Sequence, residues 1–155
     1  MTSGDEAEAD VQEAVKVVLS FTSAMNDWET RRYYRSRADA GYYTASSDAK
    51  LAGGLTAGEL DSEYHVIFER HCTKRKRTYG GFPGSWTQGG QYAGVVASTV
   101  LETNRVQPKR IEVVCRGGML PDHQYRFVVF KKGDRWLIDN VFTRVGDETW
   151  QRWQL

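Results

Sequence analysis

The feature that most constrains the fold is a change of hydrophobic period along the chain. Between residues 10 and 28, apolar side chains recur every three or four residues, which is the spacing of one helix face. These positions are Val11, Val15, Val18, Phe21, Met25 and Trp28. In the last third, segments rich in Val, Ile, Phe and Tyr are bounded by turn residues, as is typical of β-strands. The sequence therefore predicts helices followed by a sheet, an α+β fold.

The N-terminal part is expected to contain a tail and a long helix. Residues 1–9 are rich in Gly, Asp, Glu and Ala and bury little apolar surface, so they predict a flexible acidic tail. Asp10 is a suitable N-cap. The helix either continues through residues 29–43 or gives way there to a second helix that ends near Gly41. With 155 residues in all, we expect residues 10–155 to form one domain.

A capping signal marks the next helix. Residues 46–54 are small and polar and predict a loop. Thr56 and Glu59 then stand three residues apart, as in a capping box, where each side chain binds a free backbone N–H. Helical spacing continues to the basic run 74–77. The segment 79–90, with its five glycines, predicts an irregular loop.

Four strands are expected in the last third, and they are 91–102, 109–116, 124–132 and 135–143. Gly133 and Asp134 separate the last two, which predicts a two-residue hairpin turn between antiparallel neighbours. Several of these segments are apolar on both faces, so the sheet should be largely covered. The expected architecture is a curved antiparallel sheet with the N-terminal helices packed on one face, in a cone-like shape.

Charge and composition exclude several classes of function. The chain has 21 basic and 20 acidic residues, so no long-range field selects nucleic acid or a membrane surface. No secretory signal or long apolar span is present, and Cys72 and Cys115 form no Cys-x-x-Cys pair, so we expect a cytoplasmic protein. The histidines, His65, His71 and His123, lack metal-ligand spacing, and we expect no metal and no cofactor.

Two features leave chemical alternatives open. The basic run 74–77 could clamp phosphates, but cations at a helix C-terminus also complement the helix dipole, and we favour that interpretation. Asp139 lies in the middle of an expected strand, which raises the question of acid–base catalysis in a pocket. We favour a structural role for it, such as an ion pair with Arg126.

The C-terminal sequence carries a family resemblance. The run Phe130–Val141, continued by Gly146–Glu148 and Trp150–Leu155, resembles the final hairpin and tail of bacterial immunity proteins with a nuclear-transport-factor-2-like fold. Such proteins occur beside polymorphic toxins, including Rhs toxins. The segments Met25–Glu29 and Phe68–Thr73 agree with this resemblance. It covers most of the chain.

The resemblance implies a binding protein of bacterial competition. It would bind the C-terminal domain of a cognate toxin, occlude the active site or substrate entrance of that toxin, and need no catalysis or cofactor of its own. Because fold does not fix function, two alternatives stay open: a small-molecule enzyme or ligand carrier that uses the pocket of the same fold, and an adaptor for another protein. The sequence also leaves open whether the protein forms a homodimer.

Candidate contact residues are the arginines and aromatic side chains in and beside the glycine-rich loop, since these residue types anchor protein interfaces. They are Arg75, Arg77, Tyr79, Phe82, Trp86 and Tyr92. An alternative for Phe82 and Trp86 is that they cap the open end of the sheet.

Overall fold

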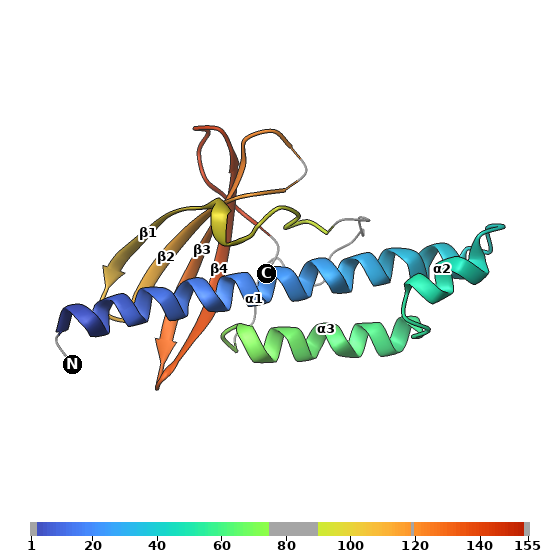
Figure 1. The fold of residues 1–155 in the computed structure, drawn as a ribbon, viewed down its shortest axis with the longest axis horizontal. Helices are drawn as coiled ribbons and strands as arrows, with labels where there is room; N and C mark the ends of the chain where they lie inside the picture. Colours follow the sequence, from blue (N-terminus) through green and yellow to red (C-terminus); the bar gives the residue numbers. More distant parts are fainter. Residues whose placement is uncertain (1–2, 75–89, 119, 154–155) are drawn as a thin grey trace.

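Three helices precede a five-stranded antiparallel sheet (Figure 1). The computed structural model describes residues 3–74, 90–118 and 120–153. The helices are α1 (Ser3–Asp39), α2 (Ala45–Leu51), α3 (Ala57–His71) and the short 3₁₀ helix η1 (Ala97–Thr99). The strands are β1 (Val100–Gln107), β2 (Arg110–Arg116), β3 (His123–Lys132), β4 (Arg135–Val145) and β5 (Gln151–Arg152). The predicted α+β class is confirmed.

The helix α1 is longer than the sequence indicated. It begins at Ser3, so residues 3–9 form its first turns instead of a flexible tail, and it continues without a break to Asp39. Its N-terminal half crosses one face of the sheet, and its C-terminal half extends past the sheet beside α2 and α3 (Figure 1). The predicted apolar face is confirmed at Val18, Phe21, Met25 and Trp28, all buried, whereas Val11 and Val15 are only partly buried.

The capping box at the start of α3 is confirmed. The Thr56 hydroxyl accepts a hydrogen bond from the Glu59 backbone N–H at 3.1 Å, and the Glu59 carboxylate accepts one from the Thr56 N–H at 3.1 Å. The indole N–H of Trp28 donates to the Leu60 carbonyl at 2.5 Å, and the Trp28 ring packs on Tyr64. These contacts fix α3 against α1.

Two expected segments were wrong. Residues 46–54, expected as a loop, include most of α2, whose Asp48 is buried and accepts a hydrogen bond from the Thr44 hydroxyl at 2.7 Å. The first expected strand, 91–102, begins only at Val100, and turns and η1 precede it. Gly94 has a φ of +84°, which a strand does not adopt, so the turns around it replace the expected strand.

The sheet is a meander in which each strand pairs with its neighbours in sequence, in the order β1-β2-β3-β4-β5. Gly133 and Asp134 form the predicted turn, and Lys132 pairs with Arg135 at the start of the β3–β4 ladder. The inner face of the sheet carries Ile111, Val113, Tyr125 and Phe127, which pack in one core with the buried face of α1. The sheet therefore positions two sets of side chains, one facing α1 and one facing away.

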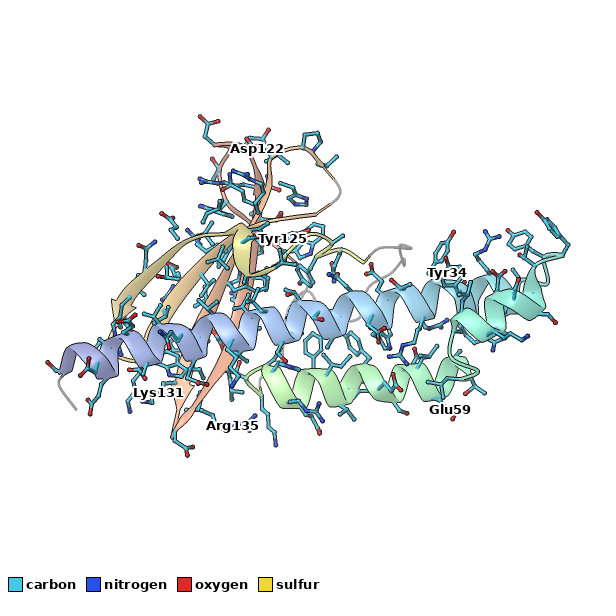
Figure 2. All side chains as sticks on the ribbon, viewed as in Figure 1. Tyr34, Glu59, Asp122, Tyr125, Lys131 and Arg135 are labelled. Atoms are coloured by element: carbon cyan, nitrogen blue, oxygen red, sulfur yellow. The ribbon has the colours of Figure 1, made fainter. Side chains whose placement is uncertain are left out.

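Asp10 fastens the N-terminal half of α1 to three strands. Its carboxylate accepts hydrogen bonds from Arg105 at 2.7 Å, Lys131 at 3.3 Å and the indole of Trp136 at 3.2 Å. Figure 2 shows Lys131 and Arg135 at the hairpin end of the sheet, beside this half of α1, and Asp122 at the opposite end. The hydrogen bond from Arg105 is the main cause that lowers the pKa of Asp10 below its ordinary value. Asp10 is thus an anchor within α1 rather than the expected N-cap.

We expect Asp10→Asn to reduce the free energy of unfolding at pH 7, because it removes the charge that Arg105 and Lys131 bind. A carboxyl with a depressed pKa in the folded state stabilises above its unfolded pKa of about 3.9 and loses this effect as pH falls through the folded value. Urea unfolding from pH 7 to pH 3 should therefore show the gap between wild type and Asp10→Asn closing below about pH 4. The exposed Asp147, changed to Asn, is the control and should show no such pH-dependent gap.

Candidate partner-binding surface

The face of the sheet that points away from α1 carries an unusual set of side chains. Strand pairing places Arg126 of β3 between Val114 of β2 and Phe142 of β4, and it places Arg152 of β5 opposite Phe142. The adjacent row contains Arg116, Gln124 and Arg144. We call this surface the arginine face, and its residues are Arg110, Arg116, Arg126, Phe130, Phe142, Arg144, Trp150 and Arg152.

The arginines of this face stack on its aromatic rings. The guanidinium carbon of Arg144 lies 4.2 Å from the ring centre of Trp150, and that of Arg126 lies 5.0 Å from the same ring. Arg126 also lies 4.7 Å from the ring centre of Phe142. The Arg144 guanidinium donates a hydrogen bond to the side chain of Gln124 at 3.1 Å. These distances are those of cation–π contacts, so the arginine side chains are held in place before any partner arrives.

The stacked side chains cover apolar residues of the sheet. Val114 and Val128 lie on the face that points away from α1, yet each is only 3% exposed. Arg126 stands directly opposite Val114, and Glu112 stands opposite Val128. The alkyl stems of arginine shield such surface while the guanidinium groups reach solvent. The face is therefore amphipathic, with apolar residues beneath a charged layer.

Two guanidinium groups of this face lack a hydrogen-bond acceptor for one of their donors. The Glu112 carboxylate lies 3.7 Å from Arg110 and 3.8 Å from Arg126, too far for hydrogen bonds. Within the described residues, the Nε atoms of Arg110 and Arg126 are buried and have no hydrogen-bond partner, although Glu112 lies within ion-pair distance of both guanidinium groups. A buried donor without an acceptor costs about 1–3 kcal/mol, so the stacked arrangement does not satisfy these arginines fully.

The structure tests one of the six predicted contact residues. Arg75, Arg77, Tyr79, Phe82 and Trp86 lie outside the described residues. Tyr92 is fully buried, and its ring packs between Phe21 of α1 and Tyr125 and Phe127 of β3 at centroid distances of 5.0–5.9 Å. A side chain that is 0% exposed cannot meet a partner, so Tyr92 belongs to the core.

Asp139 has a structural contact. It is the extra residue of a β-bulge in β4, since Val128 pairs with Asn140 and Val129 pairs with Ile138. The Thr73 hydroxyl donates a hydrogen bond to the Asp139 carboxylate at 2.7 Å, and this fixes the chain leaving α3 to the sheet. An ion pair with Arg126 is not among the ion pairs of the described residues, where Arg126 stacks on the rings of Phe142 and Trp150.

His71 links α1 to α3. Its Nδ1 lies 2.7 Å from the Ile67 carbonyl and therefore carries the proton, so Nε2 accepts a hydrogen bond from the Ser20 hydroxyl at 2.8 Å. Burial lowers the pKa of His71 and keeps the ring neutral, as does the positive charge of Arg70 and Arg135. A backbone carbonyl cannot balance an imidazolium as a carboxylate does, which disfavours a catalytic interpretation of this serine–histidine pair.

Neither a cluster of metal ligands nor a membrane-spanning helix occurs in the described parts of the chain. No group of three or more His, Cys, Asp or Glu side chains there is arranged to hold a metal ion. None of the helices in those ranges is long and apolar enough to cross a bilayer. Cys72 and Cys115 are buried free thiols, and burial raises the pKa of Cys115 to about 12.

The comparisons with known proteins gave one family. Residues 13–154 match the family described as NTF2 fold immunity protein. The match includes all of the sheet, α2, α3 and most of α1. No curated protein and no solved structure gives a significant match to the chain.

The burial of Tyr92 predicts a strong effect of its removal on stability. We expect Tyr92→Ala to lower the free energy of unfolding by about 3–5 kcal/mol, the usual loss for a buried aromatic side chain. Tyr43 is fully exposed, and Tyr43→Ala should change stability by less than about 0.5 kcal/mol. Denaturant unfolding of both variants measures the difference. Equal effects would contradict the placement of Tyr92 in the core.

Proposed function

We propose that this chain, which belongs to the NTF2 fold immunity protein family, binds and neutralises a cognate bacterial toxin domain. The family match over residues 13–154 carries the proposal, because it covers nearly the whole fold. We further propose that the toxin is the C-terminal domain of a polymorphic, Rhs-type system and that binding in the cytoplasm occludes its active site or substrate entrance.

The filled interior of the fold supports binding at an outer surface. Between α1 and the sheet, Phe21, Tyr92, Tyr125 and Phe127 occupy the space where a ligand of a cone-shaped fold would lie, and each is at most 1% exposed. Their rings are in mutual contact, with centroids 5.0–6.2 Å apart. This packing favours a protein partner over the alternative of a small-molecule enzyme or carrier.

The rigidity of the scaffold also suits a tight inhibitor. The core ties α1, α3 and the sheet into one body, so the ordered surfaces lose little conformational freedom on binding. The segment that contains Arg75, Arg77, Tyr79, Phe82 and Trp86 stays a predicted part of the contact. Among the described residues that follow this segment, the Tyr92 backbone N–H donates to the Asn26 side chain at 3.0 Å and so holds residue 92 against α1.

Co-expression with the toxin tests the proposed function. The toxic domain encoded beside this gene should stop the growth of a sensitive bacterium, and co-expression of this protein should restore growth. The two proteins should also co-purify as a stable complex, since neutralisation here depends on direct contact. Tyr92→Ala serves as the control, because a destabilised protein should rescue less well. Continued growth arrest together with the absence of a complex would refute the proposal.

A further inference from the structure

The arginine face concentrates positive charge on a chain that is nearly neutral overall. The formal net charge of the whole protein is only +1. In the strand registers of this face, the five arginines are accompanied by two acidic residues, Glu102 and Glu112. The other charges of the chain must then sum to a negative value. Such an uneven distribution steers an oppositely charged partner toward one face.

The residue types on this face are those that dominate binding energy in protein interfaces. Arginine and tryptophan are enriched at hot spots, and here Arg126 and Arg144 flank Trp150. Because stacking already restricts both arginines, less side-chain entropy is lost when a partner binds them. Val114 and Val128 beneath them exclude water, which strengthens charged hydrogen bonds made above.

The unpaired donors indicate what the partner should supply. Arg110 and Arg126 share Glu112 at distances that allow no hydrogen bond, and their buried Nε donors have no acceptor in the described structure. Carboxylates of a partner would provide the hydrogen-bond acceptors that Glu112 is too far away to provide. The guanidinium donors of this face therefore have more hydrogen-bond acceptors when an acidic partner is bound than when none is bound.

We propose that the arginine face docks an acidic surface of the cognate toxin domain, whose Asp and Glu carboxylates bind Arg126 and Arg144. This inference rests on the proposed function and adds the location and chemistry of the contact. Two other occupants fit less well. A second copy related by two-fold symmetry would set arginine faces against each other, like charge against like. Nucleic acid is attracted by a strong overall positive charge, and the formal net charge of this chain is only +1.

The test compares two variants that carry the same change of charge. The double variant Arg126→Glu, Arg144→Glu reverses the charge at the centre of the face. The double variant Lys16→Glu, Arg70→Glu reverses the charge of two exposed residues on α1 and α3. We expect the first variant to bind the purified toxin domain about 100-fold more weakly or worse, with loss of growth rescue. The control should bind within about threefold of wild type, since surface charges outside a contact contribute little.

Salt dependence and a second variant separate docking from folding. Arg116→Glu with Arg152→Glu alters exposed arginines outside the stacks, so it should stay folded by circular dichroism yet bind more slowly. The association rate of wild type with the toxin domain should fall as salt rises from about 50 to about 500 mM. The association rate of both face variants should depend less on salt concentration.

Each contrary outcome has a distinct meaning. If wild type neither binds nor rescues, the proposed function fails and this inference fails with it. If wild type binds but the folded face variants bind equally well, only the inference fails. The inference is also overturned if wild type is a dimer that the face variants dissociate. The same holds if wild type binds single-stranded RNA and the Arg126→Glu, Arg144→Glu variant loses that binding.

Discussion

The fold depends on the burial of one face of α1, because that face joins the two halves of the molecule. Phe21 contacts the rings of Phe68 and His71 on α3 and the ring of Tyr92 near the sheet. About two turns further along the helix, the indole N–H of Trp28 donates a hydrogen bond to the Leu60 carbonyl of α3. The sheet and α3 meet largely through this helix. Burial of large aromatic side chains at this junction is the main source of its stability.

One-sided packing by α1 determines what the other side of the sheet can do. A sheet with one face in the core normally presents polar residues on the other face. Here the outer face keeps Val114 and Val128 and shields them with arginine and aromatic side chains. Such a layer protects the sheet in water and, at the same time, offers interface residues without new secondary structure. The outer surface and the core therefore both arise from the alternation of side chains along each strand.

The sequence predicted those elements whose signals are local. The Thr56 capping box and the Gly133–Asp134 turn depend on neighbours in sequence, and both are confirmed. The start of α1 at Ser3 was missed, because the contacts that hold Asp10 come from distant strands. Arg110 and Arg116 stand an even number of residues apart in β2, as do Gln124 and Arg126 in β3, so the sequence places each pair on one face of its strand. Only the pairing register shows that the two pairs share the same face of the sheet. The predicted contact loop lies mostly outside the described residues, and Tyr92 was misplaced because its burial is a tertiary effect.

The Asp10 anchor has a consequence for how the protein folds during its synthesis. Its partners Lys131 and Trp136 lie 121 and 126 residues further along the chain. At about 5–20 residues per second, a ribosome exposes them roughly 6–25 s after Asp10. During that interval β3 and β4 are incomplete, so the part of the apolar face of α1 that packs on them stays open to chaperones or to solvent. The part formed by Phe21 and Trp28 can pack on α3 earlier, because α3 is made first. Asp10 thus gains its full set of contacts only after the start of β4 has been synthesised.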